Sequence, residues 1–214
     1  LSHEIKNPLG GIMGAAQLLE KTLSSESQTK FTEIILKESE RLLKLINAMA
    51  SPLQLEEKKL INVHEITEHV IELFKYDSLN SGVTFSKDYD PSIPQLMLNR
   101  NQMIQALMNI IRNAVQATGY KGVVKVKTRP IQKFTIGDIS HDLVIKIDVI
   151  DNGVGIPQDK IKEIFYPMVT SKHDGMGLGL TIAQSIIIQN KGIIECVSEK
   201  NKTIFSIILP WITE

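Results

Sequence analysis

Residues 99–118, NRNQMIQALMNIIRNAVQAT, form the most strongly periodic stretch of this 214-residue chain. Apolar side chains recur there at three- and four-residue steps, which predicts a long amphipathic helix. Asn109 and Asn113 are spaced i and i+4, so they share one helical face. Asparagine is a modest helix former. The pair therefore indicates either exposed polar positions and helix–helix hydrogen bonds, or oxygen ligands for a Mg²⁺ ion shared with phosphates.

The segments around this helix predict a domain of mixed helices and strands. Helical spacing covers residues 63–74 and 181–189. Alternating or β-branched runs predict strands at residues 83–85, 123–128, 143–150, 193–198 and 203–209. This mixture predicts an α+β domain with largely antiparallel strands, for which we expect residues 60–214. The polar segment 54–59 is the expected hinge before it.

The amino-terminal part of the chain predicts a helical hairpin. Helical spacing covers residues 1–21 and 31–49, with a polar break at residues 22–27. A lone hairpin cannot bury its apolar stripe, whereas two copies can close a four-helix bundle, so a homodimer is expected. We assign this all-α dimerisation domain to residues 1–53. Because the chain begins with Leu1 inside a helix, we expect the domain to be truncated at its amino terminus.

The composition is that of an ordinary globular protein, with 43% hydrophobic and 22% charged residues. Lys+Arg and Asp+Glu are equal at 24 each, so bulk charge gives no reason to expect a nucleic-acid partner. A single Cys196 excludes an internal disulfide framework and fits a reducing compartment. No apolar run approaches the roughly 20 residues of a membrane span. We expect a cytoplasmic protein.

The opening motif His3-Glu4-Ile5-Lys6-Asn7-Pro8 places an ionisable nucleophile beside a carboxylate. In a helix, His3 and Asn7 share a face, while Glu4 lies on a neighbouring one. Pro8 lacks an N–H group, so the carbonyl of Glu4 loses its helical partner. Taken alone, the histidine is either an ordinary surface residue or a functional group.

Three further motifs follow the long helix. Asp151-Asn152-Gly153-Val154-Gly155-Ile156-Pro157 comes directly after a strand, which suits either a buried carboxylate facing a ligand or a tight turn. Residues 165–172, FYPMVTSK, form an aromatic and apolar segment that could act as a lid. Gly175-Met176-Gly177-Leu178-Gly179-Leu180 runs into a helix, where backbone N–H groups can face phosphates. This loop is neither a Walker A motif nor a G-x-G-x-x-G motif after a strand.

In this order, the motifs resemble those of the sensor histidine kinases of two-component systems. Residues 3–8 are similar to the phosphoacceptor box of that family, and the Asn109–Asn113 helix is similar to its N box. The segments at Asp151, Phe165 and Gly175 resemble the G1, F and G2 boxes of its GHKL-type ATP-binding sandwich. The resemblance covers essentially the whole chain. Residues 3–19, 88–92 and 165–169 look most like the nitrogen-regulation branch, the NtrB type.

The resemblance implies that ATP binds in the second domain and that its γ-phosphoryl group passes to His3. Glu4 would orient or deprotonate the other ring nitrogen of His3. Asn113 would hold Mg²⁺ with support from Asn109, and Asp151 would accept a hydrogen bond from the adenine amino group. The other implied nucleotide contacts are Gly153, Gly155, Thr170, Lys172, Gly175, Gly177, Leu178 and Gly179.

The implied partner is a response regulator with an NtrC-like receiver domain, whose aspartate takes the phosphoryl group. Asn7 would position water for the opposite reaction, the dephosphorylation of that regulator. A PII-type signal protein is a further partner implied by the NtrB resemblance. Two departures from the family pattern concern the nucleotide site. A short lid with His173-Asp174 precedes the glycine loop, and Asn99-Arg100-Asn101 stands where relatives carry an acidic residue.

Three alternatives remain open at this point. The chain could be a nucleotide-binding scaffold that docks partners without phosphorylating itself. It could be an ATPase of the chaperone or mismatch-repair type, although these need a glutamate base where this chain has Asn109. Finally, a zinc site could use His64, Glu65, Glu68 and His69. The two histidines are five residues apart and do not share a helical face, so we expect surface residues there.

Overall fold

The computed structural model describes residues 2–22, 30–37, 39, 42, 57–78, 82–119, 121–167, 169, 170 and 177–212, without the side chains of residues 2–8, 22, 77 and 78. The chain divides into two compact units, Leu1–Gln54 and Leu55–Glu214. The first unit is helical and the second combines a sheet with helices, so the predicted fold class is confirmed.

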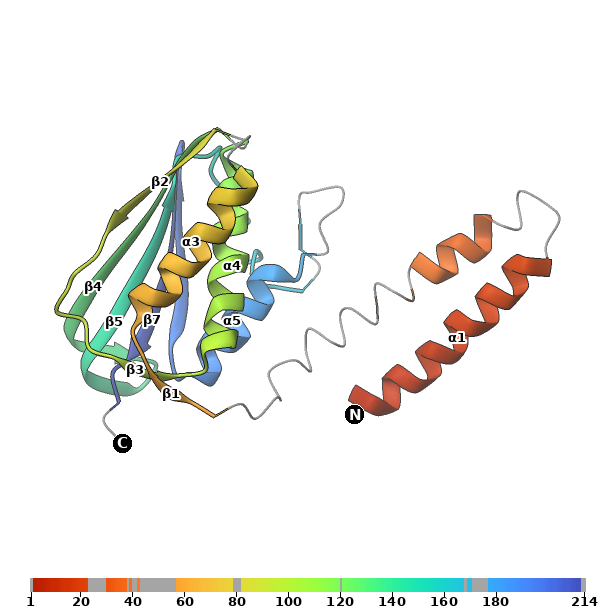
Figure 1. Cartoon of the computed structure of the whole chain (residues 1–214), viewed down its shortest axis with the longest axis horizontal. Helices are drawn as coiled ribbons and strands as arrows, with labels where there is room; N and C mark the ends of the chain where they lie inside the picture. Colours follow the sequence, from red (N-terminus) through yellow and green to blue (C-terminus); the bar gives the residue numbers. More distant parts are fainter. Residues whose placement is uncertain are drawn as a thin grey trace. The chain divides into compact units, whose positions relative to one another are not determined.

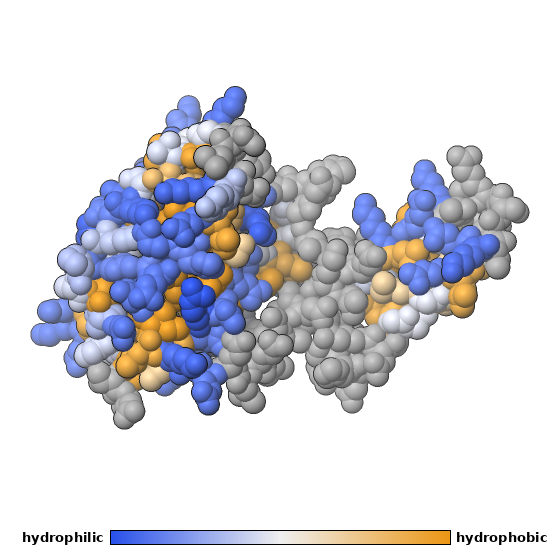
Figure 2. Space-filling model, viewed as in Figure 1, coloured by the Kyte–Doolittle hydropathy of each residue, from blue (hydrophilic) through white to orange (hydrophobic). Residues whose placement is uncertain are grey.

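The helical unit contains α1 (Ser2–Thr22) and a second helical stretch described at residues 30–37, 39 and 42. Figure 1 draws the two as an antiparallel pair. α1 runs without interruption through Pro8 and three glycines. Of its apolar stripe, Leu9 and Ala16 are buried, whereas Ile12 and Leu19 are each 49% exposed. Hydrophobic residues therefore reach the surface of this unit (Figure 2).

The second unit is built on a five-stranded sheet in the order β2-β4-β5-β7-β6. β2 pairs with β4 in parallel, and the remaining pairs are antiparallel. The strands are β2 (Val83–Asp88), β4 (Gly122–Ile136), β5 (Ile139–Asp151), β6 (Ile193–Glu199) and β7 (Lys202–Pro210). β1 (Lys59–Ile61) and β3 (Leu96–Leu98) form a separate two-stranded sheet.

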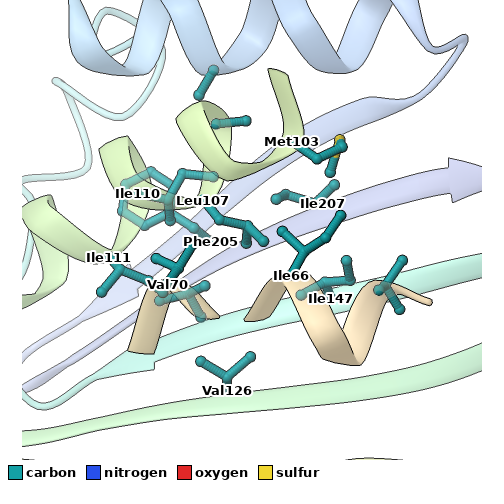
Figure 3. Close-up of a cluster of buried hydrophobic side chains, with 14 of the residues drawn as sticks. Ile66, Val70, Met103, Leu107, Ile110, Ile111, Val126, Ile147, Phe205 and Ile207 are labelled. Carbon is teal, nitrogen blue, oxygen red and sulfur yellow. The ribbon is translucent and has the colours of Figure 1, made fainter. Parts of the chain in front are cut away.

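Three helices cover one face of the large sheet (Figure 1). They are α3 (Val63–Ser78), α4 (Arg100–Ala117) and α5 (Gly179–Gln189). Figure 3 shows the core between these layers, where Ile66 of α3 and Leu107 of α4 meet Ile147 of β5 and Ile207 of β7. All four side chains are almost completely buried. This core fixes α4 and the carboxyl end of β5, which carry the predicted site.

α4 begins one residue later than predicted because Asn99 is its N-cap. The side-chain oxygen of Asn99 accepts a hydrogen bond from the backbone N–H of Gln102 at 3.0 Å. This bond satisfies one of the donors that every helix leaves unpaired at its start. The unusual Asn99-Arg100-Asn101 sequence therefore has a structural role at its first residue.

Two features of the sheet differ from the sequence prediction. β4 and β5 continue well past residues 128 and 143 and join through a two-residue turn at Gly137-Asp138, where a loop was expected. Pro130 lies within β4 although it cannot donate a ladder hydrogen bond. It lies beyond Lys127, the partner of Asp88 at the end of β2, so no described strand pairs with it on that side. The two short strands β1 and β3 were also not predicted.

None of the helices in the described part of the chain is both long and apolar enough to cross a membrane.

Candidate functional site

The buried carboxyl group of Asp151 lies at the end of β5 and is only 2% exposed. Its Oδ1 accepts a hydrogen bond from the backbone N–H of Gly153 at 2.9 Å. Burial raises the pKa of Asp151, and the bond from Gly153 opposes that rise in part. A carboxylate has about four acceptor positions. One bond from Gly153 therefore leaves capacity for a donor on a ligand.

The first half of the following loop is held against α4 and β4. The backbone N–H of Val154 donates to the carbonyl of Ala117 at 3.2 Å. A Cβ atom on Gly153 would lie 2.5 Å from that same backbone, so only glycine fits there. The side-chain oxygen of Asn152 accepts from the N–H of Val123 at 2.8 Å. These contacts hold Asp151 and Gly153 in one rigid arrangement.

The second half of the loop is held against the turn between β6 and β7. Gly155 has φ +82°, and a Cβ atom there would lie 2.7 Å from the carbonyl oxygen of Glu199. The N–H of Ile156 donates to the hydroxyl of Ser198 at 2.8 Å. The sequence motif predicted both glycines of the loop. It gave no sign of Ser198, because only the pairing of β6 with β7 brings that residue under the loop.

Asn109 of α4 faces the first residue of α5. A Cβ atom on Gly179 would lie 3.6 Å from the side-chain amide of Asn109. The Nδ2 atom of Asn109 is buried, yet no described group accepts a hydrogen bond from it. Because such a donor is costly to bury unpaired, it is a candidate for contact with a ligand. Asn113 lies one turn further along α4 and is half-buried.

The glycine-rich segment leads directly into α5. Gly177 has φ +63°, and the buried Leu178 is the N-cap residue, making no side-chain capping bond. The first backbone N–H groups of a helix have no partner within it and carry partial positive charge, which suits an anion. The backbone at Gly177, Leu178 and Gly179 is therefore suited to phosphate groups.

The aromatic segment is anchored through Phe165. The hydroxyl of Thr181 on α5 donates to the carbonyl of Phe165 at 3.0 Å. The ring of Phe165 meets Phe205 of β7 edge-on, with centroids 6.4 Å apart. Tyr166 and Thr170, further along this segment, are exposed. Phe165 is thus a fixed point from which a lid could extend.

The structure brings several predicted site residues together in the second unit. Asp151, Gly153 and Gly155 share one loop, and Asn109 lies against Gly179. The predicted phosphate contacts Lys172 and Gly175 lie outside the described residues. In the helical unit, three predicted residues lie on α1, their side chains outside the description: His3, Glu4 and Asn7.

The zinc alternative receives no support. The described residues contain no group of three or more side chains that could hold a metal ion through His, Cys, Asp or Glu. His64 was expected on the surface, and this expectation is wrong, because its ring is half-buried and stacks on Tyr89 with centroids 4.7 Å apart. Its Nε2 lies 2.9 Å from the hydroxyl of Thr128. Burial lowers the pKa of His64, against the opposing charges of Asp90 and Glu68.

Comparison with known families agrees with this fold. Residues 98–212 match the family described as histidine kinase-, DNA gyrase B- and HSP90-like ATPases. Residues 1–57 match the His Kinase A (phospho-acceptor) domain. The sandwich unit is therefore an ATPase domain of this class. With both domains in this order, the chain belongs to the sensor histidine kinases, and the predicted family is confirmed.

Relatives of known function that are similar to this chain belong to one branch of the family, the NtrB type. The chain is 43% identical over 213 residues to the sensory histidine kinase/phosphatase NtrB of Proteus hauseri. It is 41% identical over 211 residues to the same protein of Escherichia coli O157:H7. Each alignment covers 98% of this chain and 60% of the relative, so the chain spans about three fifths of the length of these proteins. The predicted similarity to NtrB is confirmed.

Solved structures share the fold. The catalytic domain of the histidine kinase ThkA is 26% identical, with a TM-score of 0.63, and covers 73% of this chain and 97% of its own. Full-length ShkA in complex with AMPPNP is 24% identical, with a TM-score of 0.66, over 100% of this chain and 45% of its own. ThkA in complex with the response regulator TrrA is 26% identical, with a TM-score of 0.64, over 98% and 59%.

Proposed function

We propose that the chain is an ATP-dependent histidine autokinase that phosphorylates His3 and passes the phosphoryl group to an aspartate of a response regulator. The observation that carries the proposal is the buried carboxyl group of Asp151, with Gly153 and Gly155 beside it, in a chain of the sensor histidine kinase family. We assign the phosphoacceptor domain to residues 1–53 and the ATP-binding domain to residues 60–214.

In this proposal Asp151 recognises the adenine ring. Its buried carboxylate accepts a hydrogen bond from the exocyclic amino group, which a guanine base does not offer at that position. Gly153 and Gly155 let the loop backbone lie against Ala117 and Glu199 beside Asp151, because neither position has room for a Cβ atom. A charge-assisted hydrogen bond in a dry pocket is stronger than one in water, which makes Asp151 the main determinant of affinity.

The phosphates would lie at the amino end of α5. Gly177, Leu178 and Gly179 offer backbone N–H groups there, and the expected contacts from Thr170, Lys172 and Gly175 extend the same site. The Nδ2 of Asn109 lies beside Gly179 and has no acceptor among the described residues, so it fits a ligand with oxygen acceptors, such as a phosphate or a water bound to Mg²⁺. Asn113 would supply the oxygen ligand to Mg²⁺, which neutralises charge as the phosphoryl group leaves.

The chemistry of transfer needs few groups. A ring nitrogen of His3 attacks the γ-phosphorus, a nitrogen–phosphorus bond forms, and the bond to the ADP oxygen breaks. Glu4 takes the proton from, or orients, the other ring nitrogen, so that the attacking lone pair stays free. The amide of Asn7, one turn along α1, would position the water that hydrolyses the phosphorylated regulator. This assignment gives the chain both kinase and phosphatase activity.

The proposed partners follow from the relatives. ThkA is seen with the response regulator TrrA, which supports a receiver domain as the acceptor here. Similarity to NtrB supports an NtrC-like receiver and a PII-type regulatory protein. The exposed half of the α1 stripe, including Ile12 and Leu19, supports a homodimer in which a second copy covers these side chains.

A pulse–chase experiment tests the proposed function. The whole chain is labelled with γ-labelled ATP and Mg²⁺, freed of nucleotide, and mixed with an NtrC-type receiver domain. We expect the chain to become labelled, and the label to move to the receiver as an acyl phosphate. A chain that binds ATP but never becomes labelled would instead be the non-catalytic nucleotide-binding scaffold.

A further inference from the structure

Ser198, near the end of β6, makes three polar contacts, and two of them reach the loop that follows Asp151. Its Oγ accepts a hydrogen bond from the N–H of Ile156 at 2.8 Å and lies 2.9 Å from Oγ1 of Thr203. Its backbone carbonyl accepts from Nε2 of Gln158 at 2.6 Å. The side chain of Ser198 is only 1% exposed. One buried residue thus holds both ends of the segment from Ile156 to Gln158.

The register of the sheet explains why this contact reaches the site. Asp151 on β5 pairs with Thr203 on β7, and Thr203 pairs with Ser198 on β6. All three side chains are buried, at 2%, 2% and 1% exposure. They therefore form a row across three strand ends, beginning at the carboxylate that we assign to the adenine ring and ending beneath the second half of the loop.

The two halves of the loop are held differently. The first half is fixed by backbone contacts to Ala117 and by the side chain of Asn152, which belongs to the loop itself. The second half lies against the β6–β7 turn, where Gly155 touches the carbonyl of Glu199 and Ile156 donates to Ser198. Loss of the Ser198 hydroxyl would leave the Ile156 N–H without this acceptor while the first half stays in place.

We propose that Ser198 is a positioning residue of the nucleotide site, which holds Gly155–Gln158 in the conformation that receives the nucleotide. This inference rests on the proposed ATP-binding function. Ser198 does not touch the reacting phosphates. Its removal therefore affects binding of substrate and transition state equally, which raises KM and leaves kcat unchanged.

The test compares four variants of the whole chain. Ser198→Ala removes the hydroxyl and Ser198→Thr keeps it. Ser206→Ala is the matched control, because Ser206 is also a buried serine and donates to Asp148 at 2.6 Å, away from the loop. Gln158 is exposed, and Gln158→Ala removes only its hydrogen bond to the Ser198 carbonyl. This variant therefore weakens the same attachment of the loop to Ser198 without changing the core.

Two readouts separate positioning from simple stability. We expect Ser198→Ala to raise the Kd and the KM for ATP about tenfold with kcat unchanged, and Gln158→Ala to raise both about threefold. Ser198→Thr and Ser206→Ala should match the parent chain. Without nucleotide, the Ile156 amide should exchange with solvent at least about tenfold faster in Ser198→Ala than in Ser206→Ala.

Equal ATP binding in Ser198→Ala and the parent, or an equal loss in Ser206→Ala, would overturn the inference. If Ser198→Ala does not fold, an unchanged Kd in Gln158→Ala would overturn it in the same way. Failure of the proposed function would look different, because then the parent chain itself would not bind ATP or Asp151→Asn would bind it normally. The amide-exchange result stands independently of either.

Discussion

The two units of the chain meet the need to bury apolar side chains in opposite ways. In the sandwich unit, Val126, Ile147 and Ile207 are completely buried between helices and sheet. In the helical unit, Leu9 and Ala16 are buried, but Ile12 and Leu19 on the same stripe remain about half exposed. The sandwich unit buries its core within itself and needs no second copy to do so. The other needs a second surface before its apolar stripe is covered.

This contrast divides the proposed reaction into two tasks. In the sandwich unit, Asp151 and its loop are held by hydrogen bonds that lie inside that unit. In the proposal, the helical unit presents the acceptor His3, and a second copy covers its exposed apolar stripe. Mutations of Asp151 and its loop in the sandwich unit should therefore change ATP binding without changing the oligomeric state, and mutations of the exposed stripe of the helical unit should do the reverse.

The largest effect is expected for Asp151→Asn. The substitution keeps the shape and the acceptor for the Gly153 N–H, but replaces a charged acceptor of the adenine amino group with a neutral one. We expect ATP affinity, measured by calorimetry, to fall about 100-fold, since hydrogen bonds to charged groups contribute about 1.5–3 kcal/mol. Autophosphorylation should be lost while light scattering still reports the parent's oligomeric state.

Asp148→Asn is the matched control for that experiment. Asp148 lies on the same strand and accepts a hydrogen bond from Ser206, away from the loop. The Asp148→Asn variant should bind ATP as tightly as the parent chain does. Normal ATP affinity in Asp151→Asn would refute the assignment of the adenine contact.

A smaller effect is expected at the exposed stripe of the helical unit. Ile12→Asp places a charge where we propose that a second copy packs. We expect the dimer dissociation constant to rise roughly 30-fold, because an unpaired polar group at a dry interface costs about 2 kcal/mol. Light scattering at several concentrations measures the change. ATP affinity should not change, since Asp151 and its loop are untouched.

Gln17→Asp adds the same charge to an exposed position of α1 that already carries a polar side chain. This variant should remain dimeric. If Gln17→Asp and Ile12→Asp weaken the dimer equally, the effect is one of net charge and the stripe is not the interface.

Asn7→Ala separates the two activities assigned to α1. We expect autophosphorylation of His3 to stay within about twofold of the parent and dephosphorylation of the regulator to slow by about tenfold or more, because a poorly positioned water reacts slowly. Single-turnover assays of both reactions measure the two rates. Equal loss of both would mean that the substitution disturbs the helix rather than the water.

The smallest effect concerns stability and pH. Burial raises the pKa of Asp151 in the folded state above its ordinary value. Between the two pKa values the folded state binds more protons than the unfolded state, so the free energy of unfolding falls as pH rises through that window. In Asp151→Asn, this pH-dependent contribution to the free energy of unfolding is absent. The variant should therefore gain stability relative to the parent as pH rises above about 4, the ordinary pKa of an aspartate, as measured by denaturant titration; a constant difference would contradict the raised pKa.

The sequence predicted those parts of the fold and site that depend on local pattern. The 99–118 helix appears as α4 because its apolar period is long and unbroken. Asp151 lies at a strand end and its glycines follow in a turn, as the motif predicted, because both features depend on neighbouring residues. The missed extension of β4 past Pro130 has a different cause. Whether a proline is tolerated depends on where the neighbouring strand ends, which local sequence does not reveal.

Non-local contacts could not be predicted either, because they depend on residues that are distant in the sequence. Ser198 lies under the loop only because β6, β7 and β5 pair in one particular register. His64 is half-buried because the ring of Tyr89 and the hydroxyl of Thr128 meet it from distant parts of the chain. The local sequence around Ser198 or His64 predicts only an ordinary surface segment.

We propose that the γ-phosphoryl group of ATP bound to the sandwich unit passes to His3 of the helical unit. The direct measurement is to incubate the whole chain with γ-labelled ATP and Mg²⁺ and to locate the label by mass spectrometry under conditions that preserve phosphohistidine. We expect a single labelled residue, His3, and no label in a His3→Gln variant that still binds ATP as tightly as the parent. Label on another residue, or equal labelling of His3→Gln, would contradict it.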